Sequence, residues 1–300
     1  MNEPPSPSTL CPKASEPENS VSPEPPLDAG SRADGPLFLV PTDFSPESYR
    51  AVQYAASLAE QVGGRVHVLH VDAPDAAAHA SAHAMRTMLE ELDLPLRPSV
   101  ECVRGSLAEE LSGTAQRMGA DYIVVTSRHM RDPEQFKQST VLQLLRYGNV
   151  PYLALQEPPE HGTIRDVVVP IDYSSEERIR HEWIPRLCAQ YSPRFHLVVP
   201  SVNEADLHDR IEENLEYTQE LLDQAGAEHE EHRLDGLDDY TPALLNYALG
   251  AGADLIVLTS TPDPRHAGRY MLEPHDRALL QQAEGIAVMV INPIQEGAAC

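Results

Sequence analysis

Short runs of apolar residues alternate with longer segments of mixed polarity along most of the chain. In the first half, four strong runs are LFLVP (37–41), RVHVLHV (65–71), DYIVVTS (121–127) and PYLALQ (151–156). Runs rich in Val, Ile and Leu of this length indicate strands that are buried on both faces. With the weaker strand SVECVRG (99–105), they predict a parallel sheet of five strands.

The segments between these runs carry helix signals. Ser45 is a good N-cap, Pro46 suits the first helical position, and the helix is expected to end near Gly63-Gly64. Ser106 and Glu109 have the spacing of a capping box, which predicts a helix to Met118. Further helices are expected at 76–92, by composition, and at STVLQLLRY (139–147).

The second half repeats two landmarks of the first. DVVVPIDYSSEE (166–177) echoes LFLVPTDFSPES (37–48), and GADLIVLTS (252–260) differs from GADYIVVTS (119–127) at its fourth and seventh positions. The offsets are nearly equal, because residue 43 corresponds to 172 (129 residues) and 126 to 259 (133 residues). Two landmarks that recur in the same order, at nearly the same distance along the chain, indicate a duplicated domain.

The second copy is expected to contain the same elements as the first. These are VVVPI, a helix opened by the Ser174/Glu177 capping box, RFHLVVPS (194–201), an acidic helix at 204–225, a weak strand near 228–234, a helix from Pro242, LIVLTS, ALLQQ and IAVMVI. The sequence therefore predicts an α/β chain with two doubly wound parallel-sheet domains, at 35–158 and 163–294. Residues 1–34 are rich in Pro, Ser and Glu and are expected to be a disordered, solvated tail.

The charge balance narrows the choice of partners. The chain has 22 basic and 47 acidic residues, a net charge of -25, and its lysines are Lys13 and Lys137. Such a surface repels nucleic acid and anionic lipid, so neither is an expected partner. An acidic, lysine-poor surface favours a salt-adapted cytoplasm over the alternative of Arg-rich codon usage with an acidic tail.

The compartment is also expected to be cytoplasmic and reducing. No stretch approaches the roughly 20 apolar residues that span a bilayer, and no secretory signal follows Met1. The cysteines are widely spaced and form no CxxC pair, which predicts neither a disulfide framework nor a zinc site; they are Cys11, Cys102, Cys188 and Cys300.

Other chemical motifs are weak. His79 and His83 have the i,i+4 spacing of a metal-binding pair, but no third ligand is evident. His67 and His70 point to opposite faces of a strand and cannot share a small ligand. The chain has no GxSxG, GxxxxGK[ST] or GxGxxG motif, so we expect neither a catalytic residue nor a metal site.

Together, the landmarks resemble the universal stress protein family in its tandem two-domain form. The resemblance rests on Pro41-Thr42-Asp43 after the first strand, HVLHV (67–71), the GAD strand at 119–127 and STVLQLLRYGNVPYLAL (139–155), and it covers about 36–157 and 164–293. It implies an adenine nucleotide alpha hydrolase-like fold with strand order 3-2-1-4-5. It also implies pairing through the fifth strand, which is internal in tandem members, with a homodimer as a further possibility.

One branch of the family binds ATP through a loop after the fourth strand, with the pattern Gly-x2-Gly-x9-Gly-[Ser/Thr]. Thr126 and His129 stand at its first two glycine positions here, and Ser139-Thr140 or Gln138-Ser139 replaces the last pair. The resemblance implies that Asp43 contacts the adenosine part of a nucleotide, although a turn role for this residue is also open. The candidate adenine-nucleotide pocket, for ATP or AMP, comprises Pro41, Thr42, Asp43, Val68, Thr126, Ser127, His129, Ser139 and Thr140.

The second copy departs further from the family pattern. Thr259 and Pro262 replace its first glycines, and Glu273-Pro274 stands at the Gly-Ser position. A carboxylate repels phosphate and proline has no N–H to donate, so this copy is expected not to bind ATP.

These observations lead us to expect a non-enzymatic stress protein that acts by binding a ligand or protein partners. Slow ATP hydrolysis at the first copy and a purely structural dimeric scaffold are the alternatives.

Overall fold

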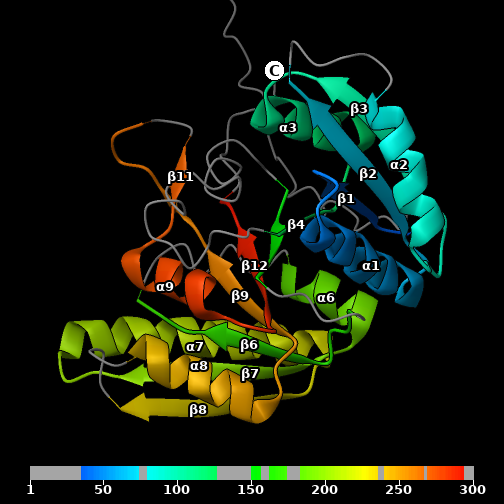
Figure 1. Cartoon of the computed structure of the whole chain (residues 1–300). Coiled ribbons are helices and arrows are strands. Elements are labelled where there is room, and N and C mark those ends of the chain that lie inside the picture. The colour runs from blue at the N-terminus through cyan, green and yellow to red at the C-terminus, as the bar shows by residue number, and fades with distance from the viewer. Residues whose placement is uncertain are drawn as a thin grey trace, which may run out of the picture. The chain divides into compact units, whose positions relative to one another are not determined.

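Ten strands form one sheet in the described part of the chain, in the order β3-β2-β1-β4-β5-β12-β9-β6-β7-β8 (Figure 1). The computed structural model describes residues 35–73, 80–126, 150–156, 162–173, 183–235, 240–266 and 269–293, all within the unit Arg32–Cys300. The predicted tail at 1–34, Cys11, Cys300, His79 and the Ser174/Glu177 capping box lie outside these residues.

The first half of the sheet has the predicted strand order 3-2-1-4-5. Its elements are β1 (Leu37–Pro41), α1 (Pro46–Gln61), β2 (Arg65–Asp72), α2 (Ala80–Glu91), β3 (Ser99–Arg104), α3 (Leu107–Met118), β4 (Tyr122–Thr126) and β5 (Tyr152–Leu155). Neighbouring strands are parallel throughout this half.

The second half has the equivalent order β8-β7-β6-β9-β12, also parallel. Its elements are β6 (Asp166–Pro170), α6 (Trp183–Tyr191), β7 (Arg194–Ser201), α7 (Ala205–Ala225), β8 (His229–Asp235), α8 (Tyr240–Ala251), β9 (Leu255–Thr259), α9 (Pro274–Gln282) and β12 (Ala287–Ile291). Helix α8 begins two residues before the expected Pro242. A small hairpin, β10 (Thr261–Pro262) and β11 (Tyr270–Met271), was not predicted.

Strands β5 and β12 join the two halves. They pair antiparallel, with Met289 opposite Leu153 and Val290 opposite Tyr152. This is the internal fifth-strand pairing that the resemblance implies.

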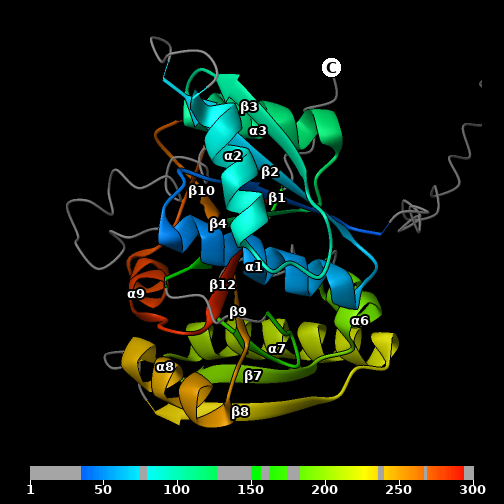
Figure 2. The same ribbon diagram turned by 45° about the vertical axis from the view of Figure 1, so that its right-hand side comes forward.

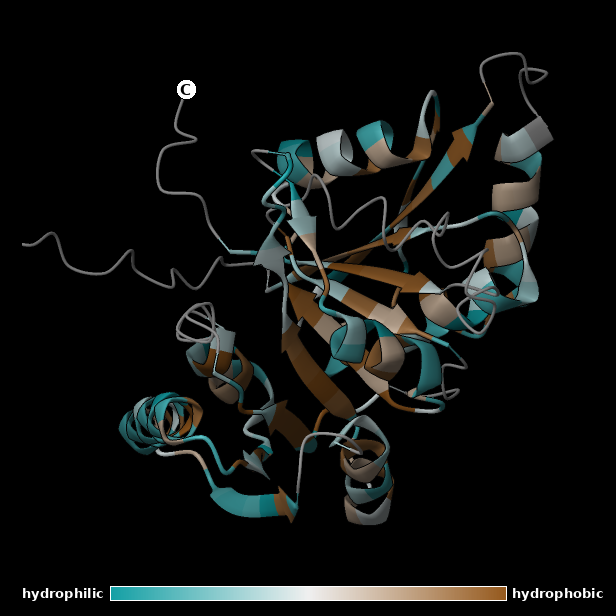
Figure 3. Cartoon of the chain, turned by 90° about the vertical axis from the view of Figure 1, so that its left-hand side faces the viewer, coloured by the Kyte–Doolittle hydropathy of each residue, from teal (hydrophilic) through white to brown (hydrophobic). Residues whose placement is uncertain are grey.

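The core lies on both faces of the sheet because successive strand residues point to opposite sides. Phe38 and Val40 pack on the face covered by α1, α2, α6 and α7, whereas Leu37 and Leu39 pack on the face covered by α3, α8 and α9. Figure 2 shows α1, α2 and α7 in a second view, and Figure 3 shows the apolar central strands and the largely polar α7. None of the helices in the described ranges is long and apolar enough to cross a bilayer.

One of the two helix caps predicted for the first half is present as expected. Ser45 caps α1, and its Oγ accepts the N–H of Ser48 at 3.2 Å. Ser106 is at the N-cap position of α3, but its side chain makes no capping hydrogen bond, so the predicted capping box is wrong in that respect. The carboxylates of Glu109 and Glu110 in the first turn instead complement the helix dipole.

Candidate functional site

Thr42 is the centre of the polar contacts at the carboxyl end of β1. Its N–H donates to the carbonyl of Leu69 at 2.9 Å, which extends the pairing of β1 with β2. Its hydroxyl is 2.9 Å from Ser48 Oγ in α1 and 3.7 Å from the sulfur of Met88 in α2. Thr42 is therefore buried and fixed by three elements, which makes this edge rigid.

Asp43 and Phe44 form the turn that follows. Asp43 is exposed, and its Oδ1 accepts the N–H of Ser45 at 3.0 Å, so the turn role left open by the sequence is present. Phe44 has a left-handed backbone with φ of 62°. Its N–H donates to Thr42 Oγ1 at 3.1 Å, and its ring centroid lies 4.3 Å from that of His70.

His70, on β2, adds a second polar group that the site prediction did not include. Its Nδ1 lies 2.7 Å from the carbonyl oxygen of Thr42, and its Nε2 lies 3.3 Å from Oδ1 of Asp72. The Ser81 hydroxyl, together with the charge of His70, holds the pKa of Asp72 below its ordinary value. The position of His70 near the carboxyl end of β2 is the signal that could have identified it.

Of the other predicted site residues, some lie at this edge, one lies in the core and four lie outside the described residues. Thr126 is the last residue of β4, and the β1–β4 register places Leu39 opposite Ile123, so Thr126 lies level with Thr42. Val68 is fully buried in the core beside α1 and α2. The structure thus brings Pro41, Thr42, Asp43 and Thr126 to one edge of the sheet; Ser127, His129, Ser139 and Thr140 lie outside the described residues.

The corresponding edge of the second half is built differently. Ile171 donates to Val198 as Thr42 does to Leu69, but the carbonyl of Asp172 accepts from the side chain of Asn214 in α7. The β10–β11 hairpin follows β9, and Leu272, next to it, is fully buried.

Helix α9 begins as the sequence suggested. Glu273 is its N-cap and Pro274 its first residue, and Glu273 Oε1 lies 3.5 Å from Thr261 Oγ1. A carboxylate and a proline therefore occupy the helix start where a phosphate would need N–H donors.

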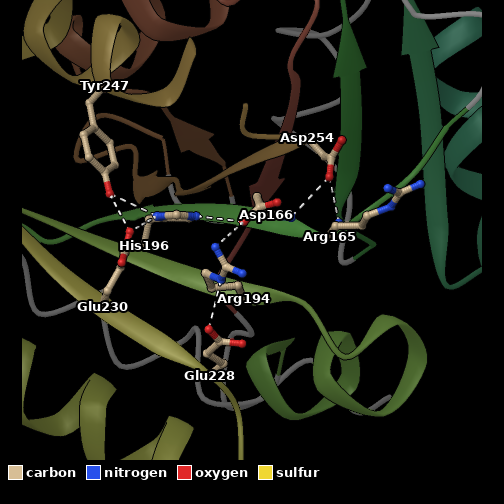
Figure 4. A network of polar contacts seen from close by, with 8 residues as sticks. All are labelled: Arg165, Asp166, Arg194, His196, Glu228, Glu230, Tyr247 and Asp254. Carbon is tan, nitrogen blue, oxygen red and sulfur yellow. Dashed lines mark hydrogen bonds and ion pairs between the residues drawn. The ribbon is translucent and has the colours of Figure 1, made fainter. Parts of the chain in front are cut away.

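A separate polar cluster lies on β6, β7, β8 and α8 (Figure 4). His196 is 3% exposed, and its Nε2 is 3.1 Å from Asp166 Oδ1 while its Nδ1 is 2.8 Å from Glu230 Oε1. The Tyr247 hydroxyl lies 3.0 Å from the same Nδ1, and burial together with Glu230 raises the pKa of Tyr247 to about 12. This cluster links the edge strand β8 to β6, β7 and α8.

No group of three or more metal-ligating side chains occurs among the residues that the structure describes. His83 is one of these residues, but its expected neighbour His79 is not.

The fold and the turn after β1 identify the structural class of the protein. The chain is an α/β protein with a doubly wound parallel sheet and a polar turn after its first strand. Residues 38–156 match the family model described as "Universal stress protein family". This segment of the chain is therefore similar to the universal stress protein family.

Solved structures resemble the chain over a longer range. A universal stress protein from Archaeoglobus fulgidus DSM 4304 is similar with a TM-score of 0.61 and 17% identity, over 87% of this chain and 97% of that one. A functionally unknown protein from Pseudomonas aeruginosa PAO1 gives a TM-score of 0.56, 16% identity and coverage of 86% and 92%. At such identities the likeness shows the fold alone. A search of curated protein sequences gave no match.

Proposed function

We propose that this protein acts in the stress response by binding the adenosine part of an adenine nucleotide at the carboxyl edge of its first half, without catalysing a reaction there. The observation that carries the proposal is the left-handed backbone of Phe44, directly after Asp43. A bulky residue with positive φ costs of order 1–3 kcal/mol and persists only where its surroundings hold it.

Of the two equivalent turns, only the one in the first half has this strain. Phe44 and Ser192 are the two non-glycine residues with positive φ in the described ranges, and Tyr173, which corresponds to Phe44, is not among them. Thr42 Oγ1 and the His70 ring hold Phe44 in place, so the exposed Asp43 is presented in one fixed conformation. Such preorganisation supports a binding role.

The chemistry of the edge suits a nucleoside better than a triphosphate. A carboxylate accepts hydrogen bonds from ribose hydroxyls or the adenine amino group, and the resemblance assigns Asp43 that contact. The loop after β4 lacks the family's glycines, and Asp132 and Glu134 add negative charge to it. We therefore propose AMP or cyclic AMP as a better ligand than ATP.

The second half has a supporting role in this proposal. We treat 35–158 and 163–294 as two domains and assign the second to architecture, since a hairpin and the Glu273-Pro274 helix start stand where a phosphate loop would lie. A cytoplasmic, salt-adapted setting and protein partners complete the proposal, because the net charge is -25.

Thermal unfolding of the full-length protein with adenosine, AMP, cyclic AMP and ATP-Mg, in high potassium chloride, tests the proposal. A ligand at 100 times its Kd stabilises the protein by about 2.7 kcal/mol. We expect stabilisation by AMP or cyclic AMP and no release of phosphate from ATP. Phosphate release would support slow hydrolysis instead, and no shift with any ligand would support the scaffold.

A further inference from the structure

A pocket of about 410 Å³ lies at the amino-terminal ends of β6, β9 and β12. It shares no residue with the candidate nucleotide site. Its lining comes from both halves of the chain and includes Tyr54 of α1 in the first half and Leu249, Gly252, Asp254, Glu284 and Gly285 in the second. Its volume is within the range of roughly 300–1,000 Å³ of sites for small molecules.

Tyr54 brings a buried hydroxyl to this pocket. The residue is 1% exposed, yet its hydroxyl forms no hydrogen bond with another residue in the described ranges. Burial first, and the charge of Asp254 second, raise the pKa of the phenol above its ordinary value, so it stays neutral. Buried polar groups are nearly always paired, so a pocket hydroxyl without a partner in the described part of the chain is suited to a ligand.

Asp254 supplies a carboxylate that is held in place (Figure 4). Its Oδ1 accepts from Thr163 Oγ1 at 3.0 Å, and its Oδ2 accepts from the N–H groups of Arg165 and Asp166 at 2.8 and 3.2 Å. These three donors fix the position of the carboxylate. A carboxylate has about four acceptor sites, so one is left for a ligand.

The remaining lining residues determine which charge and polarity a ligand of this pocket would have. Glu284 adds a second carboxylate, and the lining residues that the structure describes include no Lys or Arg. Leu249 is 58% exposed and offers an apolar wall, and the space beside Gly252 and Gly285 is open. The pocket therefore combines negative charge, one unpaired hydroxyl and an apolar surface.

We propose that this pocket binds a small organic cation, a primary ammonium group on a short apolar chain. The ammonium has three donors, which match the oxygens of Asp254, Glu284 and Tyr54. The apolar chain then lies against Leu249. A bare divalent cation fits poorly, because Ca²⁺ and Mg²⁺ take six or more oxygen ligands and two carboxylates with one phenol do not supply them.

Calorimetric titration of the full-length protein with n-butylammonium chloride tests this proposal, with 1-butanol as the neutral isostere and ionic strength fixed by potassium chloride. We expect saturable binding of one ammonium per chain and no binding of the alcohol. Removing a charged partner with Glu284→Gln should weaken binding about tenfold or more. Tyr54→Phe should weaken it several-fold.

Two controls separate the site from general attraction to an acidic protein. Glu216→Gln removes an exposed carboxylate of α7 that lies outside the pocket, and it should leave the affinity unchanged. Tyr54→Phe should keep the unfolding midpoint of the parent, since the hydroxyl makes no hydrogen bond to any residue that the structure describes. Equal weakening by Glu284→Gln and Glu216→Gln, equal binding of the alcohol, or no saturable binding would overturn the proposal. None of these results depends on whether a nucleotide binds.

Discussion

Single residues explain why the GAD segment occurs twice in the chain. In each copy the glycine has a left-handed φ, of 63° and 68°, and follows the end of a helix. The Asp121 carboxylate accepts the N–H of Leu37 at 2.9 Å, and the Asp254 carboxylate accepts the N–H of Asp166 at 3.2 Å. Each aspartate thus ties the start of a fourth strand to the start of a first strand, which accounts for the repeated sequence by a structural role.

The buried imidazole of His67 predicts how the stability of the protein depends on pH. It is 4% exposed, with Nδ1 2.8 Å from Ser99 Oγ and Nε2 3.5 Å from Glu101 Oε2. Burial lowers its pKa below 6.5 despite the nearby Glu101. Between the folded and unfolded pKa values, the unfolded chain binds more protons than the folded chain. The free energy of unfolding is therefore highest above about pH 6.5 and falls as the pH drops from there through the folded pKa.

Urea unfolding between pH 7.5 and pH 5 measures this effect. We expect the midpoint of the parent to fall more than that of His67→Gln, whose amide can still bond to Ser99. His208→Gln, at an exposed position on α7, should follow the parent. An identical pH profile for the parent and His67→Gln would contradict the assignment.

At the scale of elements, most of the sheet could be predicted from the sequence. Apolar runs such as DYIVVTS indicate buried central strands, because they are short and rich in β-branched and aromatic residues. The edge strand β8 was also found, near its expected position at 228–234. Hairpin β10–β11 was missed because each of its strands has two residues, too few to form a pattern.

The site was less predictable than the sheet. The turn residues Thr42 and Asp43 follow from their position after β1. The strain at Phe44 could not be read from the sequence, since aromatic residues rarely have positive φ and the contacts that hold this one come from other elements. The His196 cluster could not be predicted for a similar reason, because the partners of His196 come from three other elements that are distant in sequence.

At the scale of the whole described unit, the two halves share one sheet and both cores. Each hydrophobic cluster contains side chains from both halves, on its own face of the sheet. Polar contacts also cross between the halves, since the Tyr122 hydroxyl donates to Gln190 at 2.6 Å and Gln61 donates to the carbonyl of Gly162 at 2.6 Å. The halves should therefore stabilise each other.

We predict one cooperative unfolding transition for residues of both halves. Trp183, the single tryptophan of the chain, belongs to the second half, and its ring lies 5.7 Å from that of Tyr122 in the first. Its fluorescence therefore reports the junction, whereas far-ultraviolet circular dichroism reports all helices. Urea curves from the two probes should coincide. Separate midpoints would show that the halves unfold independently.

The central claim is that the first half, and not the second, binds the adenosine part of a nucleotide. Calorimetric titration of AMP into the parent, Asp43→Ala and Asp172→Ala, in high potassium chloride, tests it most directly, because the two aspartates occupy equivalent turns. We predict one saturable site in the parent, retained in Asp172→Ala and weakened at least tenfold in Asp43→Ala. No binding by the parent, or equal effects of the two substitutions, would contradict the claim.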